Sequence, residues 1–267
     1  MEQTKENKMG VMPVNKLLVT MSLPIVISML IQAMYNLVDS VFVAQINPDA
    51  LTAVGMAFPM QSLMIAFQTG LGVGMNALVS RYLGQKKPYE AGLAATHALI
   101  LTALNYVIFL IVGLTAIPAF FSIQTHSEII AGYGVEYLSI VCCGSLGLFF
   151  QIYGERILQA TGKTLLSMVS QILGAVINIV LDPVFIFVFG WGIKGAAWAT
   201  VIGQVVSGIL VVVYFWKFRK MYLEKSMLKP RLHYLKAITA LGLASCINQI
   251  AMALVQIVLN NILRYYG

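Results

Sequence analysis

The chain has 267 residues, of which 59% are hydrophobic and only 10% are charged, and its mean hydropathy is +0.85. A soluble globule carries about 25% charged residues, so this composition excludes a soluble domain, a disordered chain, a coiled coil, a collagen and a disulfide-stapled secreted domain. The net charge of +7 does not indicate nucleic-acid binding, because the basic residues fall in short gaps between apolar runs. The composition predicts a membrane protein.

Seven apolar runs are long enough to cross a hydrocarbon core of roughly 30 Å as helices. They cover residues 17–46, 51–80, 91–115, 129–154, 164–190, 195–216 and 237–263. Residues typical of loops separate them, such as Asn47-Pro48-Asp49 after the first run and Gly190-Trp191-Gly192 after the fifth. We therefore predict an all-α polytopic membrane protein whose first helix is its own insertion signal.

The basic residues predict the orientation of the helices. Fifteen of the 17 Lys and Arg residues lie in the N-terminal segment and in the second, fourth and sixth connections. Only Lys194 and Arg264 lie on the opposite side. Because loops rich in Lys and Arg stay in the cytoplasm, we expect a cytoplasmic N-terminus.

The longest basic connection suggests how the chain is divided. We expect four segments: a cytoplasmic N-terminus (1–16), a six-helix transmembrane lobe (17–216), a basic cytoplasmic linker (217–236) and the first helix of a truncated second lobe (237–267). At an offset of 220 residues, the segment 16–38 shares five identities with the start of the seventh run. This weak repeat is typical of transporters built from two halves, and it leads us to expect that the chain is a fragment of a longer protein.

Two carboxylates inside the predicted spans define a candidate site. Asp39 follows Tyr35 and Asn36 on one helical stripe, and Asp182 follows Asn178. Each Asp lies eight residues before the outer end of its run, about 12 Å along a helix. Thr200 in the sixth run lies eight residues after Gly192, which puts it at the same depth. We therefore expect these groups to meet in the outer half of the bilayer.

Two carboxylates in a low-dielectric site cannot both be ionised cheaply, so we expect either a shared proton or a bound cation between them. A sodium ion would be held by Asp39, Asn178 and Asp182, and Tyr35 and Thr200 would supply neutral hydrogen-bonding groups. The alternative is that each Asp is only a polar contact between helices.

Further polar side chains suggest a substrate cleft. They share positions inside apolar runs, mostly at helical spacing: Gln32, Asn36, Gln61, Gln68, Gln204, Gln249 and Gln256. We expect them to face a bundle interior or a central cavity. Glu155 and Arg156 are interpreted as an interface pair or a gate contact.

No enzyme motif, cofactor site or transition-metal ligand spacing is evident. The run Gly70-Leu71-Gly72-Val73-Gly74 resembles a phosphate-binding loop, but it lies inside an apolar span without a following GK[ST]. Close helix packing through small residues is the better interpretation.

The chain resembles the first half of a multidrug and toxic compound extrusion (MATE) transporter, in the bacterial multidrug efflux branch. Five segments carry the resemblance: Met34–Asp39, Arg81–Gln85, Leu158–Gly162, Asn178–Pro183 and Gly192–Thr200. The resemblance implies a secondary transporter of two six-helix lobes, which exports amphipathic or cationic drugs in exchange for protons or sodium ions. It places the cation site at Asp39, Asn178, Asp182, Tyr35 and Thr200. Helices 8 to 12 of such a transporter are missing.

Two alternatives remain open. The chain could be a flippase for a lipid-linked saccharide, although such proteins usually need basic residues inside the cleft and no Lys or Arg lies in mid-span here. It could also be a half-protein that does not transport by itself. Apart from the lipid bilayer, the expected partners are small drugs or organic cations, and either the missing second lobe or a second copy of the chain.

Overall fold

The computed structural model describes residues 12–217, 227 and 229–266, and it describes their side chains except at 215–217, 256–257 and 259–266. This part of the chain is helical and contains no β-strand, which confirms the all-α prediction. The elements in chain order are α2 (Val14–Ile46), α3 (Pro48–Gly84), α4 (Pro88–Thr115), α5 (Ile117–Gln124), α6 (Glu128–Cys143), α7 (Leu146–Ala160), α8 (Thr164–Pro183), the π-helix η1 (Val184–Val188), α9 (Ile193–Lys217) and α10 (Leu232–Tyr266).

The tight connections follow from local residue chemistry. Asn47 alone separates α2 from α3, and its side chain accepts a hydrogen bond from the backbone N–H of Asp49 at 2.9 Å, while Pro48 occupies the first turn of α3. Gly190 and Gly192 have φ angles of 67° and 55° in the turn before α9, a conformation that glycine adopts without steric cost. Both predicted loops are therefore confirmed.

Two predicted spans are not continuous α-helices. The predicted span 129–154 is divided into α6 and α7, which are bent by 48° at Gly144 and Ser145. At Gly144 a Cβ atom would lie 2.5 Å from Val201 Cγ2, and Ser145 Oγ donates to the Cys142 carbonyl at 2.6 Å. The predicted span 164–190 changes from α8 to η1 after Pro183, which cannot donate a helical hydrogen bond. Hydropathy records only that these stretches are apolar, so it missed both irregularities.

Two other boundaries differ from the expectation. Helix α5 was not predicted, because eight residues are too few to give a membrane-span signal. Helix α10 begins at Leu232, five residues before the predicted start at 237, and residues 218–226 and 228 of the expected linker lie outside the described residues.

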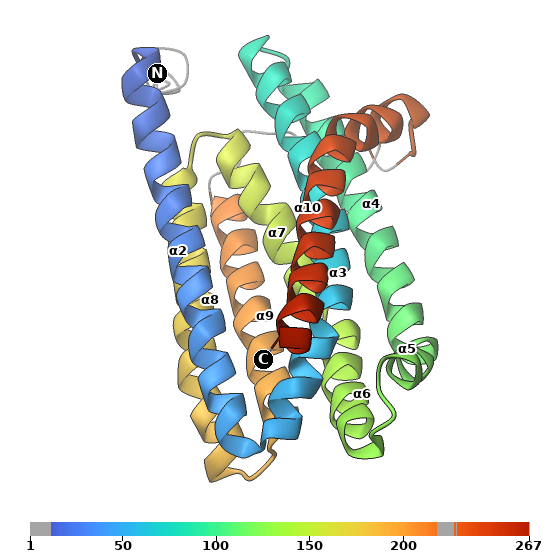
Figure 1. Cartoon of the computed structure of the whole chain (residues 1–267). Helices are drawn as coiled ribbons and strands as arrows, with labels where there is room; N and C mark the ends of the chain where they lie inside the picture. Colours follow the sequence, from blue (N-terminus) through green and yellow to red (C-terminus); the bar gives the residue numbers. More distant parts are fainter. Residues whose placement is uncertain (1–11, 218–226, 228, 267) are drawn as a thin grey trace.

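The long helices run roughly side by side (Figure 1), with α8 between α2 and α9 and with α10 packed across α3. The predicted packing through small residues is confirmed: a Cβ atom on Gly74 would lie 2.0 Å from the Ile238 carbonyl oxygen, and one on Gly242 would lie 2.1 Å from the Gly70 carbonyl oxygen. Two clusters of buried apolar side chains fill the bundle, one around Met64, Phe121 and Phe149 and the other around Met75 and Leu93.

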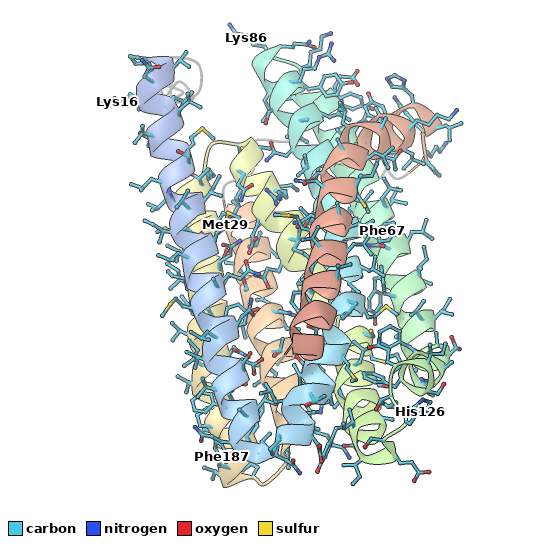
Figure 2. All side chains as sticks on the ribbon, viewed as in Figure 1. Lys16, Met29, Phe67, Lys86, His126 and Phe187 are labelled. Carbon is cyan, nitrogen blue, oxygen red and sulfur yellow. The ribbon has the colours of Figure 1, made fainter. Side chains whose placement is uncertain are left out.

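Large apolar side chains also cover the outside of the bundle (Figure 2). Met29 on α2 is 66% exposed and Phe67 on α3 is 46% exposed. Six described helices are long and apolar enough to cross a membrane, and the bent pair α6–α7 makes a seventh if it counts as one span. A surface of this kind is stable only against lipid or another apolar partner, which makes the chain a multi-pass membrane protein.

Candidate functional site

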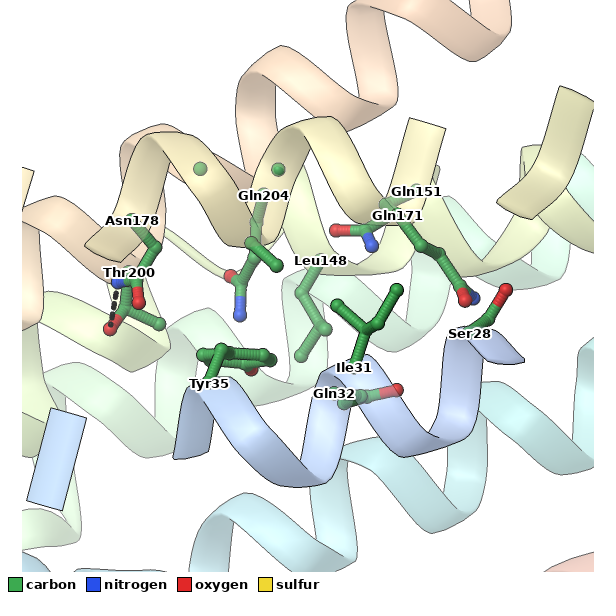
Figure 3. Close-up of a pocket in the computed structure, with 13 residues that line it drawn as sticks. Ser28, Ile31, Gln32, Tyr35, Leu148, Gln151, Gln171, Asn178, Thr200 and Gln204 are labelled. Atoms are coloured by element: carbon green, nitrogen blue, oxygen red, sulfur yellow. Dashed lines mark hydrogen bonds between the residues drawn. The ribbon is translucent and has the colours of Figure 1, made fainter. Parts of the chain in front are cut away.

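A polar pocket with a cavity volume of about 50 Å³ lies between α2, α7, α8 and α9 (Figure 3). Its walls combine amide and hydroxyl side chains with small and aliphatic ones: Ser28, Ile31, Gln32, Tyr35, Leu148, Gln151, Gln171, Gly174, Ala175, Asn178, Thr200, Gly203 and Gln204. The mixture of apolar walls with a few polar groups suits an amphipathic molecule.

Close packing of α8 on α9 sets one end of this pocket. A Cβ atom on Gly203 would lie 2.7 Å from the Gly174 carbonyl oxygen, so the absence of a side chain lets the two helices approach closely. Asn178 and Thr200 meet as a result, with the Asn178 amide nitrogen donating to Thr200 Oγ1 at 3.4 Å and to Asp182 Oδ1 at 3.5 Å. With the amide rotated by 180°, its nitrogen donates to Asp182 Oδ2 at 3.3 Å and its oxygen accepts from the Thr200 backbone N–H at 3.1 Å. Asn178 joins Asp182 to α9 in either orientation.

Asp39 on α2 completes this group. Its carboxyl group lies close enough to that of Asp182 for the two groups to interact electrostatically. Asp182 is fully buried, and Asp39 Oδ1 is buried without a hydrogen-bond partner in the described part of the chain. Because an ionised carboxylate only accepts hydrogen bonds, the pair needs a proton or a cation between its oxygens. Asn178 links Asp182 to Thr200, so Asp39, Asp182 and Thr200 belong to one group, and Tyr35 lines the adjoining pocket wall.

The chemistry of the donor set restricts the ion. The carboxylates of Asp39 and Asp182, the amide oxygen of Asn178 and the hydroxyl of Thr200 offer only oxygen atoms, which suit a proton or a hard cation such as Na⁺. Among the described residues, no group of three or more His, Cys, Asp or Glu side chains gathers in a way that could hold a metal ion.

The structure separates the expected cleft residues into two groups. Gln32 and Gln204 line the pocket, whereas Asn36 is exposed on α2 and is not part of the wall. Gln61 donates to the hydroxyl of Tyr137 at 3.2 Å. Gln32 and Asn36 therefore face different surroundings although both lie on α2, and Gln61 on α3 contacts a neighbouring helix.

The remaining expected cleft residues lie away from the pocket. Gln68 is fully buried and donates to Thr102 Oγ1 at 3.0 Å and to the Phe149 carbonyl at 3.1 Å, so it is part of the packed interior. Gln249 is exposed on α10, and the side chain of Gln256 lies outside the described residues. A seven-residue spacing places two glutamines on one helix face, but it does not tell whether a pocket or a neighbouring helix covers that face.

Sequence reasoning missed a second polar group, centred on Glu155. This residue is 5% exposed, and its carboxylate accepts hydrogen bonds from Gln151 Nε2 at 2.9 Å and from Gln171 Nε2. Glu155 and Arg156 form no close ion pair among the described residues, although their charges interact electrostatically. Arg156 Nη1 donates instead to Gln159 Oε1 at 3.1 Å. Adjacent residues of a helix point in different directions, which explains the correction. The spacing of Gln151 and Glu155, four residues apart, was the signal that could have revealed this group.

The fold and the pocket thus define a polytopic helical membrane protein with buried carboxylates beside a polar pocket. A family model described as MatE matches residues 24–184, more than half of the chain. The chain therefore belongs to the MATE family, and the resemblance found in its sequence segments is confirmed.

Curated relatives and solved structures agree with this assignment. The chain is 26% identical to the multidrug export protein MepA of Staphylococcus haemolyticus over 256 residues, which cover 94% of this chain and 56% of the relative. MepA of Staphylococcus aureus strain MRSA252 is also 26% identical, over 263 residues that cover 96% and 57%.

Among solved structures, a MOP superfamily transporter from Pyrococcus furiosus superimposes with a TM-score of 0.89 and 32% identity, covering 98% of this chain and 58% of that one. A MATE protein in complex with MaL6 gives a TM-score of 0.88 and 32% identity, covering 92% and 55%. The chain spans little more than half the length of these relatives.

Proposed function

We propose that this chain forms one lobe of a secondary transporter that exports amphipathic or cationic drugs in exchange for H⁺ or Na⁺. The opposite wall of the cleft would come from a second lobe or from a second copy of the chain. The transporter would lie in the bacterial cytoplasmic membrane with its N-terminus in the cytoplasm, and it would carry out no chemical reaction on its substrate. The names of the MepA relatives support drug export.

The single observation that carries this proposal is the carboxyl pair of Asp39 and Asp182 at the edge of the pocket. A proton or sodium ion that binds there removes the repulsion between the two groups and so changes how α2 packs against α8. Tyr35 lies on α2 four residues before Asp39 and lines the pocket. Ion binding would therefore change the pocket wall and release the drug. The ion and the drug are exchanged because each favours a different conformation of the protein.

The decisive experiment is ion-driven export by purified protein in liposomes, with a pH gradient and a sodium gradient applied separately. The variant Asp39→Asn removes one charge of the pair at nearly constant size, so export should fall to the level of empty liposomes under either gradient. Asp49→Asn is the matched control, since Asp49 lies in the first turn of α3 and outside the pocket. Full gradient-driven export by Asp39→Asn would refute the coupling mechanism.

The same assay separates the alternatives. The described pocket wall contains no Lys or Arg to hold a pyrophosphate group, which disfavours a flippase for lipid-linked saccharides. A half-protein that does not transport would give no flux with the unaltered chain under any gradient.

A further inference from the structure

The end of the pocket away from Asp182 has an arrangement that the coupling mechanism does not use. Asn178 and Thr200 lie at one end of the pocket and Gln151 and Gln171 at the other, with Gln204 between them (Figure 3). Glu155 lies directly behind Gln151 and Gln171 and binds both amide nitrogens. One pocket therefore has a carboxylate site at each end.

The hydrogen bonds of Glu155 determine how the two glutamines are oriented. Because both amide nitrogens point toward its carboxylate, both amide oxygens turn away from it. The Gln151 and Gln171 oxygens are buried and have no hydrogen-bond partner in the described part of the chain, and the same is true of the Gln204 oxygen. All three residues line the pocket.

Three buried acceptors without donors are costly in a protein interior, where polar groups are normally paired. A ligand that brings several N–H donors would satisfy them, and a positive charge on it would be compensated by the Glu155 carboxylate behind the two amides. A protonated primary amine has three N–H donors and one positive charge. Ile31, Leu148 and the ring of Tyr35 provide apolar surface farther along the pocket for the body of such a molecule.

We propose that Glu155, Gln151, Gln171 and Gln204 form a binding site for the protonated amine head of a ligand, separate from the carboxyl pair that couples transport to ions. The proposal deepens the proposed function and rests on it in one respect, that the pocket is the ligand site. It assigns recognition of N–H donors to one end of the pocket and ion coupling to the other.

The test compares 4-phenylbutylamine with its N,N,N-trimethyl derivative, which keeps the charge and the phenyl group but has no N–H donor. Binding is measured by titration calorimetry on protein in lipid nanodiscs, without an ion gradient and with empty nanodiscs subtracted. We expect the unaltered protein to bind the primary amine about tenfold more tightly than the trimethyl compound. Glu155→Gln should abolish this preference, and the control Glu136→Gln should keep it, because Glu136 pairs with Lys194 at 3.0 Å outside the pocket.

A second variant does not depend on replacing the buried charge. Gln204→Leu removes one unpartnered oxygen at similar volume, so the ligand-free protein should unfold at a higher temperature while the preference for the primary amine falls several-fold. If Gln204 had only a structural role, Gln204→Leu would instead lower the unfolding temperature and leave the preference for the primary amine unchanged.

Two results would overturn the proposal. One is an equal preference for the primary amine in Glu155→Gln and in the unaltered protein. The other is binding of NaCl alone that is lost in Glu155→Gln, with neither amine preferred, which would make the site one for an inorganic cation. Because binding is measured at equilibrium, a preserved amine preference without gradient-driven export would refute the antiport function alone.

Discussion

At the residue scale, the side chain of Asn178 connects two helices of the candidate site. It contacts Asp182 within its own helix and Thr200 on α9, so it links the buried carboxylate to the neighbouring helix. The sequence predicted Asp39, Asp182 and Thr200 at one depth, since ionisable residues in apolar runs are few and the helical rise is constant. It did not distinguish Gln204, which lines the pocket, from Gln68, which packs inside, because both are glutamines in apolar helices.

We expect Asn178→Leu to keep the fold and to lose ion-driven export. The substitution removes the amide that binds Asp182, and the unpaired buried group costs about 1–3 kcal/mol of stability. Export in liposomes and thermal unfolding in detergent would be measured together, with Asn36→Leu as the control because Asn36 is exposed on α2. Normal export by Asn178→Leu would exclude a part for this amide in coupling.

At the scale of the helices, the contact of α3 with α10 depends on glycines that leave no room for a side chain. The backbone of Gly70 and Gly74 on α3 packs directly against the backbone of Gly242 and Ile238 on α10. The glycine run in the sequence predicted this kind of packing, but not its partner, since α10 lies more than 160 residues later in the chain. The bend between α6 and α7 was missed for the same reason, because it depends on Val201 of α9.

Two glycines of α3 provide a matched test of that contact. Gly74→Ala would place a Cβ atom 2.0 Å from the Ile238 carbonyl oxygen, a backbone atom that cannot turn aside. We expect a loss of about 1–3 kcal/mol in stability, from overpacking. At Gly55, where a Cβ atom would meet nothing within 4 Å, alanine should be neutral or stabilising by about 0.5–1 kcal/mol. Thermal unfolding of both variants is the measurement, and equal shifts would contradict the close approach.

At the scale of the whole molecule, the residues at the two ends of the bundle correspond to the two sides of the membrane in the predicted orientation. Lys16 and Lys86 lie at one end of the bundle, and His126 and Phe187 lie at the other (Figure 2). The uneven distribution of Lys and Arg predicts that the Lys86 end faces the cytoplasm.

Cysteine labelling in intact bacterial cells would test this orientation. In a background with Cys142, Cys143 and Cys246 replaced by alanine, a membrane-impermeant thiol reagent should label His126→Cys from outside. It should label Lys86→Cys only after the cells are permeabilised. Both positions are exposed, so a difference in labelling reports the side of the membrane. The reverse pattern would invert the topology and the proposed direction of export.

The sequence by itself determined that this protein is helical and lies in a membrane, roughly where its long helices run, and that Asp39 and Asp182 lie at one depth. These properties depend on hydropathy and on the regular rise of a helix, which are local. Only the tertiary structure decided which polar side chains face a pocket, where α6 bends into α7, and that Glu155 binds Gln151 and Gln171 instead of Arg156. Those outcomes depend on what the neighbouring helix places opposite each residue, and no local pattern contains that information.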